Sequence, residues 1–176
     1  YIEEIGKYMA WFKMNTFHLH INEDSGLGGE YSSSFVVESK KYPQLNTYNK
    51  GYIWSQEEYK QMQKNLNAYG VQVVTEIDTP GHATIFDLIS PEIVNGSNFD
   101  LANHYDECLA LISDVFDEFL DGDDPVFQSA TVHIGTDESG NSNENMRRYI
   151  NDLAQYVLSK DNVDDVMFWG NLSVYP

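Results

Sequence analysis

Apolar and polar positions follow two different periods along the chain. Segments with the helical period, in which apolar residues recur every three or four positions, cover residues 2–12, 55–70, 103–122 and 143–159. Segments that read as strands cover residues 13–22, 71–78, 130–136 and 166–169. The long stretch between residues 23 and 54 is rich in glycine and serine, and it is predicted to be a loop.

Local signals mark the ends of two of these helices. Ser55 and Glu58 have the spacing of a capping box, and Gly70 is placed to end the helix that they begin. Asn103 is predicted to cap the next helix, which Gly122 would end.

The alternation of helices and strands indicates parallel βαβ units, which build either an open doubly wound sheet or a (βα)8 barrel. Within the strands, one set of side chains is apolar and the other becomes polar toward the C-terminal end. An open sheet covered by helices on both faces should be apolar on both. The pattern therefore favours a barrel whose inner face leads to a site at the C-terminal ends of its strands.

The number of strands fits only part of such a barrel. A complete barrel takes roughly 250 residues and eight strands, whereas this chain has 176 residues. We expect an α/β fold that is a partial (βα)8 TIM barrel of about four βα units, with residues 1–176 forming a fragment of a single catalytic barrel. Its two open sheet edges, and inner apolar residues such as Val74 that would lack facing partners, predict self-association.

Charge and composition narrow the classes of partner. The formal net charge of −18 would repel a phosphate backbone, so nucleic acid is not an expected partner. No apolar run reaches the ~20 residues that a membrane-spanning helix needs. Cys108, the single cysteine, lies on an apolar helical stripe, which is typical of a small buried residue rather than a reactive thiol. A neutral ligand such as a sugar is compatible with this surface.

Polar side chains gather toward the ends of all four predicted strands, where barrel enzymes carry their catalytic groups. These side chains are His18, His20, Asn22 and Asp24; Glu76, Asp78 and His82; His133, Asp137 and Glu138; and Trp169. Each alone has an ordinary structural explanation, but their recurrence at equivalent strand ends indicates a functional site. From the residues alone, a zinc site formed by His18 and His20 with Asp78, His82 or His133 stays open.

Three of these segments resemble one enzyme family, glycoside hydrolase family 20, the β-N-acetylhexosaminidases. Residues 13–24, which include HLHINED, resemble its second barrel strand, and EIDTPGH at residues 76–82 resembles its third-strand signature. HIGTDE at residues 133–138 resembles its fourth-strand signature, although the family often has glycine where Thr136 stands. Trp169 matches the tryptophan of its fifth strand. The order and spacing of these motifs agree over nearly the whole chain.

The resemblance implies that the chain carries barrel strands 2–5 of an enzyme that removes terminal β-linked N-acetylhexosamine from glycans. The implied mechanism retains configuration and uses the substrate's own 2-acetamido group as the nucleophile. Asp137 and Glu138 would be the catalytic pair, with Glu138 as general acid and base and Asp137 stabilising the oxazolinium intermediate. Because adjacent residues of an extended chain point apart, this pair is poorly placed to act as acid and enzymic nucleophile on one bond.

Further roles follow from the same resemblance. Asp24, His82 and Trp169 would contact the substrate, and His20, Asp78 and His133 would support the groups that do so. No metal and no cofactor are expected, and the partner is a glycan with a terminal N-acetylhexosamine. The family also implies an extracellular or cell-surface location. Because the family's first strand and later strands carry further sugar-binding residues, we expect the 176-residue piece alone to hydrolyse negligibly.

Three alternatives stay open. Within the family, the enzyme could release a disaccharide, as a lacto-N-biosidase does. Outside it, the chain could be a metal-dependent barrel hydrolase. It could also be a non-catalytic carbohydrate-binding or structural remnant of a barrel.

Overall fold

The structure is a computed structural model, and it describes residues 1–24, 33–49 and 51–170. The elements are α1 (Ile2–Trp11), β1 (Thr16–His20), β2 (Asn22–Asp24), β3 (Ser33–Phe35), η2 (Pro43–Asn49), α2 (Gln56–Ala68), β4 (Gln72–Glu76), η3 (Thr84–Leu88), η4 (Pro91–Ile93), β5 (Val94–Asn95), β6 (Asn98–Phe99), α3 (Tyr105–Leu120), β7 (Thr131–His133), α4 (Asn143–Leu158) and β8 (Asp165–Met167). The four predicted helices and four predicted strands are therefore all present, and the strands are shorter than predicted.

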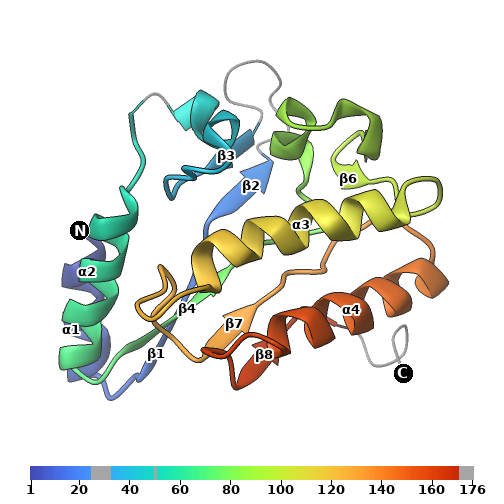
Figure 1. The fold of residues 1–176 in the computed structure, drawn as a ribbon. Coiled ribbons are helices and arrows are strands. Elements are labelled where there is room, and N and C mark those ends of the chain that lie inside the picture. The colour runs from blue at the N-terminus through green and yellow to red at the C-terminus, as the bar shows by residue number, and fades with distance from the viewer. Residues whose placement is uncertain (25–32, 50, 171–176) are drawn as a thin grey trace.

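One parallel sheet organises the molecule, with the strand order β1-β4-β7-β8 (Figure 1). Its register pairs His20 with Glu76, Glu76 with His133, and His133 with Met167. Residues paired across a parallel sheet point to the same face. This register therefore gathers the polar residues near the C-terminal strand ends on one face and confirms the predicted α/β architecture.

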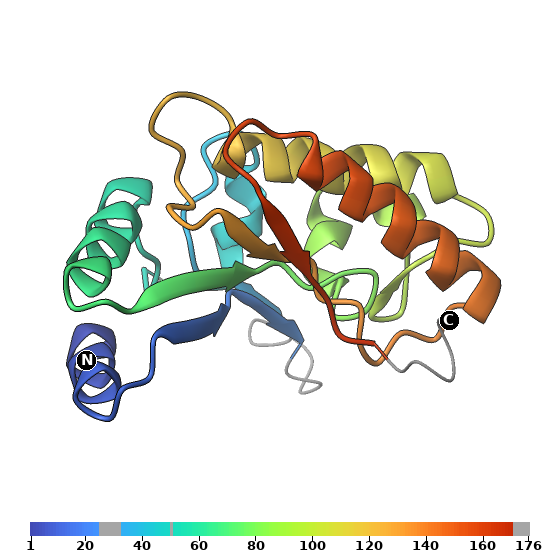
Figure 2. The same cartoon turned by 90° about the horizontal axis from the view of Figure 1, so that it is seen from below.

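Helices cover the opposite face of the sheet. The helices α3 and α4 lie side by side along it, and α1 and α2 pack against each other beside β1 and β4 (Figures 1 and 2). The core between these layers includes Val71, Val73 and Ile77 from the β4 segment and Val132 and Ile134 from the β7 segment. These are the residues that the alternation assigned to the apolar face. No helix in the described part of the chain is long and apolar enough to cross a bilayer.

The predicted loop between residues 23 and 54 is more ordered than expected. Strand β2 pairs with β3 in an antiparallel two-stranded sheet, η2 follows, and Val37 forms a parallel bridge with Trp54. Phe35, Val37 and Leu45 are each fully buried. Burial of these side chains compensates for the entropy of ordering the segment. The prediction of a loop rested on the glycine and serine content and did not take these apolar residues into account.

The local predictions have mixed outcomes. The capping box of Ser55 and Glu58 is present. Asn103 is not the cap of α3, because it bonds to Asp100 instead: its Nδ2 donates to Oδ2 at 2.8 Å, and the N-cap position falls on His104. Val74 is not uncovered as predicted, since only 2% of it is exposed.

The main sheet has two open edges among the described residues, as expected from the sequence. Within the described ranges, β1 pairs in the main sheet only with β4, and β8 only with β7. At the β8 edge, 45% of Phe168 is exposed, while Val166 packs against the core.

Candidate active site

A cavity of about 280 Å³ opens at the C-terminal end of the main sheet. It is lined by His18, His20, Glu23, Glu76, Asp137 and Trp169. The sheet register explains the gathering, because His20 and Glu76 are paired neighbours and Trp169 lies two residues beyond the end of β8. Polar groups from four strands therefore converge on one space, as the sequence predicted.

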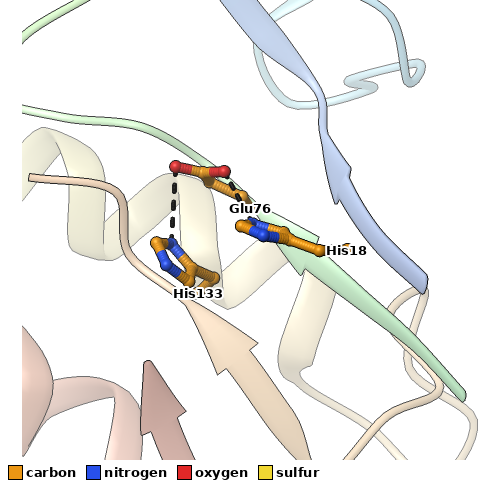
Figure 3. Close-up of side chains that lie close together, drawn as sticks. All are labelled: His18, Glu76 and His133. Carbon is orange, nitrogen blue, oxygen red and sulfur yellow. Dashed lines mark ion pairs between the residues drawn. The ribbon is translucent and has the colours of Figure 1, made fainter. Parts of the chain in front are cut away.

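Glu76 is the buried centre of this cluster, with 1% of the residue exposed. The indole N–H of Trp169 donates to Oε1 of Glu76 at 2.8 Å. On the other oxygen, Oε2 lies 3.1 Å from Nδ1 of His20 and 2.7 Å from Nε2 of His18. Figure 3 shows His18 and His133 approaching different oxygens of this carboxylate.

The charge of Glu76 is stabilised by these neighbours. Burial raises the pKa of the carboxyl group, but contacts with His133 and His20 outweigh it and hold the pKa well below its usual range. In return, the hydrogen bond to Glu76 raises the pKa of His20 against the opposing effect of burial. The cluster thus holds an ionised carboxylate next to an imidazole that favours its protonated form.

His133 has two competing contacts at one nitrogen. The peptide N–H of Gly135 donates to Nδ1 at 3.0 Å, and the same Nδ1 lies 3.4 Å from Oε1 of Glu76. A nitrogen that accepts from Gly135 cannot also donate to Glu76. The Gly135 contact needs a lone pair on Nδ1 and the Glu76 contact needs a proton there, so the two contacts exclude each other at any one moment.

Three groups of side chains have spacings that could hold a metal ion. They are His18, Glu76 and His133; His20, Glu76 and Asp78; and Asp78, His82 and Asp137. In the first group, Nδ1 of His133 and Oε1 of Glu76 already accept N–H groups. These donors point at atoms that a metal would need, so the chemistry of the group fits a hydrogen-bonded cluster better than a metal centre.

Asp78 forms a second buried centre below the cavity and has no exposed surface. Its backbone N–H donates to Oδ1 of Asn22 at 2.7 Å, and its Oδ1 accepts from the N–H of Thr136 at 2.9 Å. Gly135 must be glycine here, because a Cβ would fall 1.9 Å from Oδ1 of Asp78 and the backbone has φ +72°. Thr136 follows with φ +90°, a region that favours the glycine often found there in the resembling family.

The carboxyl groups of Asp78 and Asp137 interact. Burial, together with the interaction with Asp137, raises the pKa of Asp78 to about 9. Oδ2 of Asp78 and Oδ1 of Asp137 are buried, and neither has a hydrogen-bond partner among the described residues; Oδ2 of Asp78 also lies 3.7 Å from Nε2 of His82. Two carboxyl oxygens can bond only when one carries a proton, so a protonated Asp78 can donate to Asp137.

Glu138 lies beside His82 and outside the lining of the cavity. Its backbone has φ +46°, which is the left-handed region and not the extended conformation assumed from the sequence. Oε2 of Glu138 lies 3.6 Å from Nε2 of His82, and 77% of the Glu138 side chain is exposed. Nδ1 of His82 is hydrogen-bonded to Oε1 of Glu23 at 2.6 Å. The loops meet closely here, since a Cβ on Gly81 would fall 2.6 Å from the carbonyl oxygen of Asp137.

The structure distributes the predicted site residues unevenly. Asp137, His20 and Trp169 line the cavity, Asp78 and His133 lie buried near it, and His82 and Glu138 form a contact outside its lining. Asp24 does not line it, because its Oδ2 accepts from Oγ1 of Thr84 at 2.6 Å.

Two lining residues, Glu23 and Glu76, were given no specific role by sequence reasoning, and His18 was considered only as a zinc ligand. The strand alternation placed His18 and Glu76 on the inner face, so a signal for them was present. Glu23 lies on a short strand that the sequence read as loop, and nothing in its pattern marked it.

Comparison with known proteins adds a family to this geometry. The family model described as "Glycosyl hydrolase family 20, catalytic domain" matches residues 1–167. A β-hexosaminidase of Porphyromonas gingivalis is 29% identical over 163 residues, which cover 78% of this chain and 19% of that protein. Subunit A2 of a β-hexosaminidase from Dictyostelium discoideum is 27% identical over 140 residues, covering 74% of this chain and 23% of that one.

Solved structures agree on the fold. The β-N-acetylhexosaminidase from Bacteroides fragilis superposes with a TM-score of 0.74 at 26% identity, over 96% of this chain and 37% of that one. A Streptomyces plicatus N-acetyl-β-hexosaminidase in complex with Thio-NAglucal gives a TM-score of 0.78 at 19% identity, over 99% of this chain and 36% of that one. The predicted partial TIM barrel is thereby confirmed. The chain spans about a fifth of the length of the two curated relatives above.

Proposed function

The chain belongs to glycosyl hydrolase family 20, and from this membership we propose that it contributes the catalytic pair to hydrolysis of terminal β-linked N-acetylhexosamine. The observation that carries the proposal is the division between Asp137 and Glu138. Asp137 lines the cavity beside Trp169 and is coupled to Asp78, whereas Glu138 lies against His82 with an exposed carboxylate. One carboxylate can therefore face the reacting sugar while the other reaches its leaving group.

The proposed mechanism is substrate-assisted and retains configuration. The carbonyl oxygen of the 2-acetamido group attacks the anomeric carbon as the bond to the leaving oxygen breaks, and Glu138 gives its proton to that oxygen. Asp137 accepts a hydrogen bond from the acetamido N–H and stabilises the positive charge of the oxazolinium intermediate. Glu138 then removes a proton from water, which attacks the anomeric carbon and releases the sugar.

The three predicted substrate-contacting residues fit this scheme differently. Trp169 presents a half-exposed indole to the cavity, which suits a wall of the acetamido pocket. Asp24 is bound to Thr84, so we propose that it ties β2 to η3 rather than contacting sugar in this arrangement. His82, between Glu23 and Glu138, would orient the acid.

A chromogenic aryl N-acetyl-β-glucosaminide tests the proposal. The full natural chain that carries residues 1–176 should release the chromophore, and a chelator should not change the rate. Loss of turnover on chelation would favour the metal-dependent hydrolase. Binding of the sugar without turnover would favour a carbohydrate-binding remnant. Faster turnover of an aryl lacto-N-bioside would favour disaccharide release.

We further propose that residues 1–176 are part of a single catalytic barrel and that this piece alone associates through its open edges and turns over negligibly. The supporting observation is that β1 and β8 each have one neighbour in the main sheet within the described residues. A monomeric sedimentation profile of the isolated piece would contradict the association. Turnover near the rate of the full chain would contradict the inactivity.

We also propose an extracellular or cell-surface location for the enzyme, on the basis of family membership. Activity recovered in the medium or on intact, washed cells of the source would support it. Activity that appears only after lysis would contradict it.

A further inference from the structure

Glu76 has no part in the hydrolysis scheme, yet it is the most connected buried carboxylate of the site. We propose that Glu76 is a positioning residue for Trp169: it holds the indole at the angle that shapes the pocket for the 2-acetamido group. The inference rests on the proposed function, because it concerns the selectivity of that same site for the N-acyl group of its substrate.

The main chain of Trp169 is fixed by the β7 loop. Its backbone N–H donates to the carbonyl oxygen of Gly135 at 2.7 Å, and its own carbonyl accepts from Oγ1 of Thr136 at 2.5 Å. These bonds fix the position of the backbone of Trp169 but not the rotamer of its indole. The side chain still has two rotatable bonds, and 45% of the residue is exposed.

The contact with Glu76 fixes the remaining freedom. The indole N–H donates to Oε1 at 2.8 Å, and the acceptor is almost completely buried. One side of the indole lies against two imidazoles, with ring centroids 5.0 Å from His133 and 5.5 Å from His18. Trp169 also lines the cavity, so a rotation of the indole would change the shape of the pocket directly.

The negative charge of Glu76 is needed for this arrangement. Its Oε2 lies near His18 and is hydrogen-bonded to His20, while its Oε1 accepts from Trp169, so both oxygens of the carboxylate are in use. A glutamine at this position offers only one acceptor oxygen. If the amide oxygen accepts from Trp169, the amide NH2 group faces the two imidazoles, and the charge-assisted contact with His20 is lost. If the amide is turned the other way, its NH2 group faces the indole N–H, and two donors oppose each other. Glu76→Gln should therefore loosen the indole while changing the volume of the side chain very little.

A matched control lies elsewhere in the chain. Glu118 on α3 is a less buried carboxylate that also has several donors: it accepts from Oγ of Ser39 at 2.6 Å, from the N–H of Lys40 at 2.6 Å and from Nε2 of Gln56 at 2.8 Å. It does not line the cavity. Glu118→Gln thus removes the charge of another multiply hydrogen-bonded carboxylate without touching Trp169.

The kinetic experiment compares aryl glucosaminides that carry N-acetyl or N-butyryl groups, using the full natural chain with Glu76→Gln, Trp169→Phe, both changes, or Glu118→Gln. Glu76→Gln should lower kcat/KM for the N-acetyl substrate about 10- to 100-fold, the scale of a misplaced wall in a site, and should reduce the preference for N-acetyl over N-butyryl. Adding it to Trp169→Phe should cost under about threefold, because its target is gone. An equal loss in both backgrounds, or an unchanged N-acyl preference, would overturn the proposal.

An NMR measurement keeps the proposal testable if the enzyme turns over neither substrate. The indole N–H signal of Trp169, identified by its loss in Trp169→Phe, should shift and exchange faster with solvent in Glu76→Gln but not in Glu118→Gln. An unchanged signal in Glu76→Gln would show that Glu76 does not hold the indole. Absence of turnover by the wild-type chain, with the signal shifted as expected, would contradict the proposed function alone.

Discussion

Asp78 and Asp137 place two carboxyl groups together in a buried space, and the pKa of Asp78 is raised to about 9 as a result. Burial and the neighbouring Asp137 therefore favour the protonated form of Asp78. A protonated Asp78 can serve as a hydrogen-bond donor to Asp137, the group proposed to stabilise the oxazolinium intermediate.

The first prediction concerns the pH dependence of stability. A carboxyl group whose pKa is about 9 in the folded chain and near 4 in the unfolded chain stabilises the fold fully below pH ~4. That contribution is lost as the pH rises from ~4 to ~9. Asp78→Asn replaces the proton with a permanent N–H donor, so the stability of this variant relative to wild type should increase with pH across that range. Urea unfolding at intervals from pH 5 to pH 9 measures the difference.

Asp114 provides the control for this prediction. A hydrogen bond from Lys41, followed by one from Tyr42, lowers the pKa of Asp114, so this group is ionised in both states above pH ~5. Asp114→Asn should therefore change stability by a similar amount throughout pH 5–9. If the difference between Asp78→Asn and wild type were equally flat, Asp78 would not hold the proton.

The second prediction concerns Gly135. Gly135→Ala places a Cβ against the carboxyl group of Asp78 and also strains a backbone with φ +72°. Gly70→Ala strains a similar backbone, with φ +77°, but its Cβ would meet nothing within 4 Å. Backbone strain alone costs roughly 1–2 kcal/mol. Gly70→Ala should therefore lower the free energy of unfolding by about that much, as measured with urea, and Gly135→Ala should lower it clearly more. Equal losses would mean that Asp78 can move aside.

Strand alternation was enough to predict which faces of the sheet are apolar and polar. It placed Glu76, Asp78 and His133 on the inner face, and the parallel register then brought Glu76 and His133 side by side. The alternation could not show that Glu76 is the centre of the cluster. That position depends on the stagger between β1, β4 and β7, which a single strand does not encode.

Sequence reasoning failed where a side chain has a choice of partners. Asn103 carries a group suited to its predicted role as a helix cap, but its nearby partner Asp100 binds it first. Asp24 bonds to Thr84, and its contact with substrate stays a prediction. The direction of Glu138 depends on a backbone with φ +46°, which residue type alone would not suggest. The fold was therefore more predictable than the details of the site.

The third prediction concerns metal. Because Nδ1 of His133 and Oε1 of Glu76 already accept N–H groups, the purified full natural chain should contain less than about 0.1 equivalents of zinc, the residue left by weak surface binding. Elemental analysis after dialysis measures this content. Stoichiometric zinc that disappears in His18→Gln, together with loss of activity on chelation, would restore the metal-dependent alternative. Zinc unaffected by His18→Gln would lie elsewhere.

The fourth prediction separates the roles of Asp137 and Glu138. If Glu138 protonates the leaving oxygen, Glu138→Gln should slow substrates with poor leaving groups by about 10²- to 10⁴-fold, the usual value of general acid catalysis. Activated aryl glycosides need little protonation and should be slowed far less in the step that breaks the glycosidic bond. Rates of this step for a series of aryl N-acetylglucosaminides with leaving groups of increasing pKa measure the difference, with wild type as the reference.

Asp137→Asn should behave differently, because both kinds of substrate depend on the same internal nucleophile. It should slow activated and unactivated substrates by similar factors, and it should weaken binding of a thiazoline that mimics the oxazolinium, since the stabilising charge is gone. A covalent glycosyl–enzyme adduct trapped on either carboxylate would contradict the scheme, because the nucleophile then belongs to the enzyme. Swapped phenotypes, in which only Asp137→Asn spares activated substrates, would exchange the two roles and leave the contact of Glu138 with His82 without a catalytic explanation.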